Sequence, residues 1–223
     1  MKKLILFLGI LTATTGFSQT VKEVGTFNSI AVFDKITATL IPSKENKVEL
    51  SGAESENVEL INKNGALKIK MSFAKTLQGD DVKAKVYYTS LEEITADEGS
   101  VIKADEVIKS NALKVNVKKG GHLTATVETE RITVRGNSGG ISNLKGKATF
   151  QDIVSNAGAE INHKKLLTKQ TEVTANAGGI AEVAASDLVD AKTRAGGTIK
   201  VYGETKELRE KNIAGGSVTL VKE

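Results

Sequence analysis

From about residue 95 onward, apolar and polar positions alternate in short stretches, and this pattern repeats around a glycine. The intervals between the repeating glycines are 21, 19, 19, 20, 18 and 19 residues. These glycines are Gly99, Gly120, Gly139, Gly158, Gly178, Gly196 and Gly215. Three residues after them lie Ile102, Leu123, Ser142, Ile161, Ala181, Ile199 and Val218. Five residues before them lie Ile94, Val115, Val134, Ile153, Val173, Ala191 and Glu210. Each unit therefore predicts two short strands of period two that meet at a glycine corner.

A repeat of this length with strand-like alternation is typical of a β-solenoid. Glycine suits the corner because it adopts positive φ without a Cβ clash. When the coils stack in register, each column becomes a ladder of like side chains about 4.8 Å apart. No coil can bury its apolar face alone, so stacking creates the core. The expected fold is all-β: a parallel β-helix with coils of about 19 residues over residues 96–223.

Residues 19–95 are rich in strand patterns but lack the strict glycine repeat. The expected strands are Thr26–Phe33, Lys35–Ile41, Lys47–Ser51, Val58–Ile61, Ala66–Phe73 and Val82–Tyr88. Asn64–Gly65 predicts a tight hairpin between the fourth and fifth of them. An open solenoid end is an unpaired sheet edge, so we expect residues 19–95 to cap or continue the solenoid as one folding unit with residues 96–223. The charged stretch Glu204–Lys211 is interpreted as an elongated loop of the last coil.

The first 18 residues have the pattern of a secretory signal peptide. Lys2 and Lys3 precede the short apolar run Leu4–Leu11, and Gly16 and Ser18 are small residues before the expected cut after Ser18. The apolar run is too short for a stable membrane span. We therefore expect an extracytoplasmic protein, in the periplasm, at the cell surface or secreted.

The composition of the chain excludes several kinds of functional site. The chain has no cysteine, which excludes disulfides, thiol nucleophiles and a lipid-anchored cysteine start. Without Lys2 and Lys3, 29 basic side chains face 27 acidic ones, and the charges are interspersed. This pattern is typical of solvated strand faces and does not support nucleic-acid binding.

Candidate catalytic and metal-binding residues are few. His122 and His163 lie in neighbouring coils, and His163 occupies a column otherwise filled by Ala, Leu and Val. A metal ligand or general base is one interpretation, but no second His, Cys or carboxylate column accompanies it, so a structural role is favoured. The carboxylates cluster at Asp80–Asp81, Asp97–Glu98 and Asp105–Glu106. Alternation points such neighbours to opposite faces, so no catalytic pair is expected from them.

Three further sets of residues are candidates for a functional role. Ser138, Ser155 and Ser217 lie near corners without a nucleophile motif or a recognisable His partner, and are interpreted as turn residues. Tyr87 and Tyr88 are expected on opposite faces, which leaves at most one of them, besides Tyr202, for a sugar-binding platform. Each of Asn137, Asn156 and Asn176 precedes a corner glycine by two residues. A ladder of amides bonded between coils is favoured over a binding row. We predict no catalytic residue, cofactor or metal.

Several segments together resemble the head GIN domain family, described as auto-transporter adhesins of Gram-negative bacteria. The resemblance covers nearly all of the expected mature chain. It rests on Phe27–Val32, Leu67–Ile69, Val82–Tyr88 with Leu91–Ile94, and the corners Asn137–Ile141, Asn176–Ile180 and Ala195–Ile199. The chain departs from the family by preferring Gly-Gly at corners, by Ala159, and by Thr89–Ser90 in place of a proline before Leu91. The resemblance implies a right-handed parallel β-helix and no known catalytic residues.

Three functions follow from these observations. The first is a non-enzymatic exported adhesin-like or envelope module that contacts a glycan, a surface polymer or another protein. The second is an enzyme that acts on polysaccharide in a groove on the side of the helix. The third is self-association through the ends or faces of the solenoid, against which Glu210 and Asn212 would act as interruptions of the apolar columns.

Overall fold

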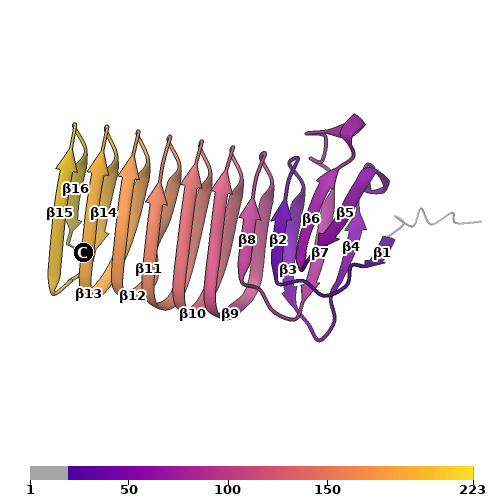
Figure 1. The fold of residues 1–223 in the computed structure, drawn as a ribbon, viewed down its shortest axis with the longest axis horizontal. Helices are drawn as coiled ribbons and strands as arrows, with labels where there is room; N and C mark the ends of the chain where they lie inside the picture. The colour runs from indigo at the N-terminus through magenta and orange to yellow at the C-terminus, as the bar shows by residue number, and fades with distance from the viewer. Residues whose placement is uncertain (1–19, 223) are drawn as a thin grey trace, which may run out of the picture.

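A computed structural model describes residues 20–222, so the expected signal peptide lies outside the described residues. They form one 16-stranded sheet that winds into a β-solenoid of about seven turns with coils of ~19 residues. The predicted all-β parallel solenoid is therefore confirmed. Figure 1 shows the strands side by side along one long axis, with the C-terminus at the far end.

Five long strands build the regular part of the solenoid. They are β9 (Val101–Lys118), β10 (His122–Asn137), β11 (Ile141–Ser155), β12 (Glu160–Asn176) and β13 (Ile180–Arg194). Each strand supplies one face of a coil, bends near its middle, and continues as the opposite face. Neighbouring strands pair in parallel, with His122 opposite Ile141 and Ile141 opposite Glu160. The tight corners thus lie at one edge of the solenoid and the bends at the other (Figure 1).

The N-terminal strands follow a different order in space than in sequence. They are β1 (Thr20–Glu23), β2 (Ser29–Val32), β3 (Thr37–Pro42), β4 (Lys47–Ser51), β5 (Val58–Lys63), β6 (Ala66–Met71), β7 (Lys83–Tyr88) and β8 (Glu93–Ala96), with short 3₁₀ turns at Ser55–Asn57 and Phe73–Lys75. Strands β2 and β3 pair in parallel with β8 and β9, and β6 and β7 form the next coil outward. Strands β1, β4 and β5 add antiparallel pairs at this end. The Asn64–Gly65 hairpin is confirmed, with both residues at positive φ.

The C-terminal strands are β14 (Thr198–Tyr202), β15 (Glu207–Ile213) and β16 (Ser217–Val221). The loop predicted over Glu204–Lys211 is confirmed only over residues 204–206 and was wrong from Glu207 onward, because β15 pairs in parallel with β13 along its whole length. Leu208 packs against the core, and the ladder hydrogen bonds outweigh the charged composition of this segment. Val218 and β16 complete the last coil.

The corners explain the Gly-Gly preference. At the corner after β10, Ser138 and Gly139 both have positive φ, which forms the tight turn. A Cβ on the next residue, Gly140, would lie 2.3 Å from the backbone of Val117 in the preceding coil. The second glycine is therefore required by close stacking of coils, in addition to the turn.

Candidate binding groove

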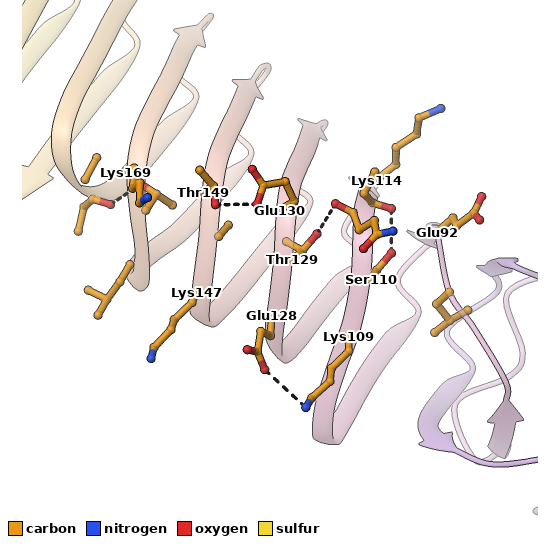
Figure 2. A pocket seen from close by; sticks show the side chains of 18 of the residues that line it. Glu92, Lys109, Ser110, Lys114, Glu128, Thr129, Glu130, Lys147, Thr149 and Lys169 are labelled. Carbon is orange, nitrogen blue, oxygen red and sulfur yellow. Dashed lines mark hydrogen bonds and ion pairs between the residues drawn. The ribbon is translucent and has the colours of Figure 1, made fainter.

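A groove runs along the bends of the described residues and has a volume of about 1470 Å³. It begins beside Asn28 and Glu93 at the starts of β2 and β8, crosses the bends of β9 to β13, and ends at Tyr202. At the usual strand spacing this path is about 30 Å long. The groove therefore runs along the solenoid axis, across the strands and not parallel to them (Figure 2).

One small residue per coil forms the floor of the groove. Ser110 lies opposite Thr129, Thr129 lies opposite Ala148, and Thr168 lies opposite Ala185. Ala148, Thr168 and Ala185 are buried, while Ser110 and Thr129 are half-buried. The floor residues are Ser110, Thr129, Ala148, Thr168 and Ala185. We call them the floor row.

Longer side chains flank the floor row on both sides. One rim contains Lys109, Glu128, Lys147 and Leu167, and the other contains Asn111, Glu130, Thr149 and Lys169. Figure 2 shows Lys109, Glu128 and Lys147 on one side and Glu130, Thr149 and Lys169 on the other. Lys109 and Glu128 form an ion pair at 3.7 Å, and Thr149 donates a hydrogen bond to Glu130 at 2.9 Å.

The two histidines have different environments. His163 is fully buried, and burial lowers its pKa to about 3, so it is neutral. The amide of Gln151 donates to its Nδ1, and its Nε2 donates to Ser142 Oγ at 2.9 Å. The sequence did not reveal this Ser–His contact, because Ser142 and His163 belong to different interior columns of adjacent coils. Both side chains have no exposed surface, so the pair is part of the core and is closed to a substrate.

A short chain of polar groups continues from His163 through the core. Thr171 Oγ1 lies 3.4 Å from Gln151 Oε1 and 2.8 Å from Thr168 Oγ1, and Thr168 donates to the Ala184 carbonyl at 2.8 Å. The buried polar groups thus satisfy one another, as low-dielectric interiors require.

His122 lies on the opposite, outward side of its strand and is half-buried. Its Nε2 lies 2.7 Å from Asn143 Nδ2, and Asn162 in turn donates to Asn143 at 2.9 Å. Burial and the nearby Lys103 lower the pKa of His122. No group of three His, Cys, Asp or Glu side chains among residues 20–222 is arranged to hold a metal ion.

The predicted asparagine ladder forms in part. Asn176 donates to Asn156 Oδ1 at 2.8 Å, one coil away. Asn137 is exposed, and within the described part of the chain the bond does not extend to it. The ladder therefore joins two coils at the corner edge, far from the bends.

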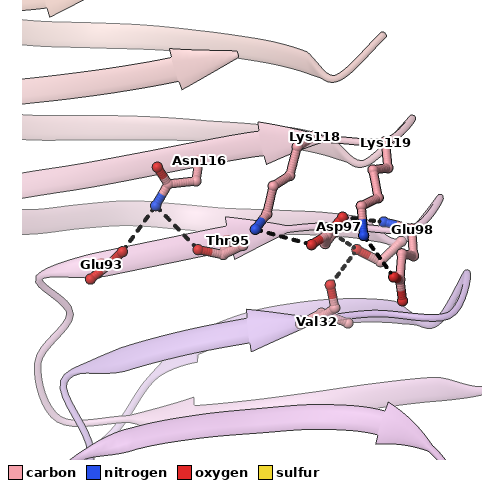
Figure 3. Close-up of polar contacts among 9 residues, drawn as sticks. Val32, Glu93, Thr95, Asp97, Glu98, Asn116, Lys118 and Lys119 are labelled. Atoms are coloured by element: carbon pink, nitrogen blue, oxygen red, sulfur yellow. Dashed lines mark hydrogen bonds and ion pairs between the residues drawn. The ribbon is translucent and has the colours of Figure 1, made fainter. Parts of the chain in front are cut away.

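The carboxylates singled out from the sequence do not converge. Asp97 is buried at the first corner and pairs with Lys118 at 3.2 Å, while Glu98 pairs with Lys119 at 3.0 Å (Figure 3). Asp80 forms an exposed ion pair with Lys35, and Asp81 accepts the backbone N–H of Ala53. Asp105 and Glu106 are exposed in an irregular stretch of β9.

A column of acids that the sequence analysis missed lies on the outer face beyond the groove. Asp152 is opposite Glu172, and Glu172 is opposite Asp190, in three successive coils. Arg135 makes a two-fold contact with Asp152, at 3.2 and 2.8 Å, and Lys192 pairs with Asp190 at 3.1 Å. This column could have been found in the sequence, since each of the three acids precedes its corner glycine by six residues.

The remaining candidates have structural environments. Ser155 is buried and donates to the Ala159 carbonyl, and Ser138 sits in a corner. Tyr87 points outward and donates to Glu49, whereas Tyr88 is buried, as alternation predicted, and burial raises its pKa to about 12. Tyr202 borders the groove and donates to Glu182 at 3.2 Å.

Glu182 is the most strongly paired carboxylate of this region. Burial alone would raise its pKa, but hydrogen bonds from Lys164, Lys200 and Tyr202 hold the pKa below its usual range. Lys164 also lies 5.0 Å from the centre of the Tyr202 ring. This cluster fixes one end of the groove.

Comparison with protein families shows to which family the chain is related. The profile of the family described as "putative auto-transporter adhesin, head GIN domain" matches residues 26–205. The chain belongs to this family. Comparison with curated protein sequences gives no match. Among the described residues, no helix is long and apolar enough to cross a membrane.

Several solved structures share the fold of this chain. A "putative adhesin" from Bacteroides fragilis has a TM-score of 0.84 at 16% identity, covering 93% of this chain and 98% of that one. A "putative adhesin" from Parabacteroides distasonis has a TM-score of 0.71 at 21% identity, covering 93% and 97%. A "putative lipid binding protein" from the same species has a TM-score of 0.69 at 15% identity, covering 93% and 98%. At these identities the likeness concerns the fold.

Proposed function

We propose that this head GIN domain protein is an exported, non-enzymatic, adhesin-like module of the cell envelope that holds an extended surface polymer in the groove along its bends. The observation that carries the proposal is the floor row, which continues through five successive coils. A groove that crosses coils in register presents the same kind of contact repeatedly, which suits a polymer better than a single small molecule.

The electrostatics of the groove support binding over catalysis. Glu128 forms an exposed ion pair with Lys109, and Glu130 accepts a hydrogen bond from Thr149. A glycosidase needs two carboxyl groups that face each other across the scissile bond. The groove acids are instead distributed along both rims and paired with their neighbours. The signal peptide predicted over residues 1–18 supports export.

The proposal is tested by binding of the chain from residue 19 to a panel of soluble glycans, envelope polymers and envelope proteins. Thr149→Trp places a large side chain on the rim, and Val154→Trp places it on the outer face of the same strand. We expect Thr149→Trp to reduce binding at least tenfold and Val154→Trp to leave it within twofold. The proposal fails if no panel member binds, or if both variants bind like the unaltered protein.

The acid column on the outer face favours a second candidate, hydrolysis of a polysaccharide. Asp152, Glu172 and Asp190 lie one above another, as paired carboxylates from different coils would. Release of sugar products that Glu172→Gln abolishes would establish this activity and displace the binding module. We expect no products from either protein.

A further inference from the structure

A smaller concavity lies on the outer face of the sheet at the N-terminal end of the solenoid. It has a volume of about 300 Å³ and lies over β4, β7 and β3. These strands are neighbours in the sheet, and β9 follows β3 (Figure 1). None of the residues that line it belongs to the groove along the bends. The concavity is therefore a separate feature of the surface.

The strand register places three lysines around two threonines here. Lys83 lies opposite Thr37, and Lys85 lies opposite Thr39, on the side of β7. On the side of β9, Lys103 lies opposite Thr39. At the usual strand spacing, Lys85 and Lys103 are about 10 Å apart with Thr39 between them. The flexible stem of lysine lets ammonium groups from both sides converge over the threonines. We call these five residues the lysine cradle.

The polar groups of the lysine cradle are available to a ligand. Its three lysines are exposed and its two threonines are half-buried. Within residues 20–222, none of the five side chains forms a hydrogen bond or an ion pair. Three like charges this close repel one another, so a bound anion would relieve the repulsion.

The acid beside the lysine cradle has other partners. Glu49 lies opposite Lys85 on the side of β4. It pairs with Lys47 at 3.0 Å and accepts a hydrogen bond from the Tyr87 hydroxyl at 3.0 Å. The hydrogen bond from Lys47 holds the pKa of Glu49 below its usual range. The carboxylate is thus engaged by donors outside the cradle.

Other nearby acids are also directed elsewhere. Asp80, just before β7, pairs with Lys35 at 3.3 Å, and Asp81 accepts a backbone N–H at 2.9 Å. Asp105 follows in the irregular stretch of β9 and makes no ion pair with Lys103 in the described part of the chain. The positive charge of the cradle is therefore left for an external anion.

The donors of the cradle favour a phosphate group over a carboxylate. A phosphate group has oxygens in several directions, so it can accept from Lys85 and Lys103 on opposite sides and from the Thr39 hydroxyl beneath. Lysine binds such a group as a point charge. A carboxylate is planar and matches the fork of arginine best, and strands β3, β7 and β9 contain no arginine.

We infer that the lysine cradle binds a phosphate group, either free or as the terminal ester of a larger compound. The three ammonium groups neutralise its charge, and the threonine hydroxyls donate to its oxygens. This site is independent of the proposed function, because it shares no residue with the groove.

The test is an NMR titration of the chain from residue 19 with inorganic phosphate at low ionic strength, where exposed charges are least screened. We expect saturable shifts of the backbone amides of residues 37–39, 83–85 and 101–103. His122 gives a second readout, because burial and then Lys103 lower its pKa. Sulfate keeps its charge throughout a pH titration, and its binding beside Lys103 should raise the pKa of His122.

Matched variants distinguish the cradle from the general charge of this face. Lys85→Gln removes a cradle ammonium group, and Lys145→Gln removes an exposed lysine from the same face, two coils beyond β9. Thr39→Val removes a hydroxyl at constant charge, and Thr126→Val does the same outside the cradle. We expect phosphate to bind about fivefold more weakly to Lys85→Gln and to Thr39→Val, since one hydrogen bond contributes about 1 kcal/mol. The two control variants should bind like the unaltered protein, and circular dichroism checks that all four are folded.

Three results would overturn the inference. They are the absence of saturable shifts, equal weakening by Lys145→Gln and Lys85→Gln, and an unchanged affinity of Thr39→Val. The second and third would show diffuse attraction of anions to the whole face.

A vesicle assay identifies the source of the phosphate group. The protein is sedimented with vesicles of phosphatidylcholine, with and without phosphatidic acid. Sedimentation that requires phosphatidic acid and is lost in Lys85→Gln supports a lipid headgroup as the ligand. Binding of glycerol 3-phosphate without sedimentation supports a soluble ester.

Discussion

At the scale of single residues, the interior contains a pair of positions, Gly136 and Ala159, at which a small residue in one coil makes room for a larger one in the next. Ala159 occupies the position that Gly121, Gly140, Gly179 and Gly197 hold at other corners. A Cβ on Gly136, in the preceding coil, would lie 2.9 Å from the Cβ of Ala159 and 2.9 Å from Ile161 Cδ1. The Cβ of Ala159 therefore lies where a side chain at position 136 would have to be, and glycine at 136 leaves room for it.

This exchange gives a testable cycle. Gly136→Ala should destabilise the protein by about 1–3 kcal/mol, because the new methyl group overpacks the interior. Gly136→Ala combined with Ala159→Gly should recover most of that loss. Urea unfolding of the two single variants and the double variant measures the coupling. Additive losses would show that Gly136 and Ala159 do not compensate each other.

His163 predicts a dependence of stability on pH. Its folded pKa of about 3 lies below the ordinary 6.5, so the unfolded chain binds one more proton between these values. Stability should therefore fall as the pH drops from about 6.5 towards 3, by at most about 1.4 kcal/mol per pH unit from this group. His163→Gln should reduce the slope of unfolding free energy against pH in this window, whereas the outward His122→Gln should reduce it less. An unchanged slope in His163→Gln would contradict the assignment of a neutral, buried imidazole.

At the scale of strands, the outer faces carry unfavourable as well as favourable ladders. Glu172 lies between Asp152 and Asp190, directly opposite both, and like charges in such positions are destabilising. Glu172→Lys should raise the free energy of unfolding by about 0.5 kcal/mol, and high salt should remove the difference. Thermal unfolding at low and high ionic strength measures this. If Glu172→Lys instead lowers the stability at low salt, Glu172 makes a favourable interaction and is not destabilised by its acidic neighbours.

The strands also show how far sequence reasoning extends. The corners were predictable because a glycine marks each of them, and the inward columns follow by counting from it. No residue type recurs at every bend. The register shifts near Thr124, Asn143 and Asn162 also change the number of residues between each bend and its corner glycine. The floor row therefore could not be aligned from sequence. The Ser142–His163 contact was missed for a related reason, since it joins two columns across the interior.

At the scale of the molecule, the two ends of the solenoid differ. The N-terminal end has antiparallel strands, whereas at the other end Leu220 is 44% exposed and Ile213 is 40% exposed. Glu210 stands on β15 in the column of buried apolar residues. An inward charge at an open edge disfavours pairing with another chain.

Glu210→Val should therefore promote self-association. Sedimentation velocity of the variant should show a larger species that grows with concentration, while Lys211→Val, on the outward side of the same strand, should resemble the unaltered protein. Equal sedimentation of all three proteins would contradict a protective role for Glu210.

The central prediction is that a ligand lies in the groove along the bends. Hydrogen–deuterium exchange with and without a bound polymer from the binding panel tests this directly. We predict slower exchange in the bends, at residues 109–112, 128–130, 147–149 and 167–169, with the corner glycines and the outer faces unchanged. Protection confined to the corners or to the face of Asp152, Glu172 and Asp190 would contradict it.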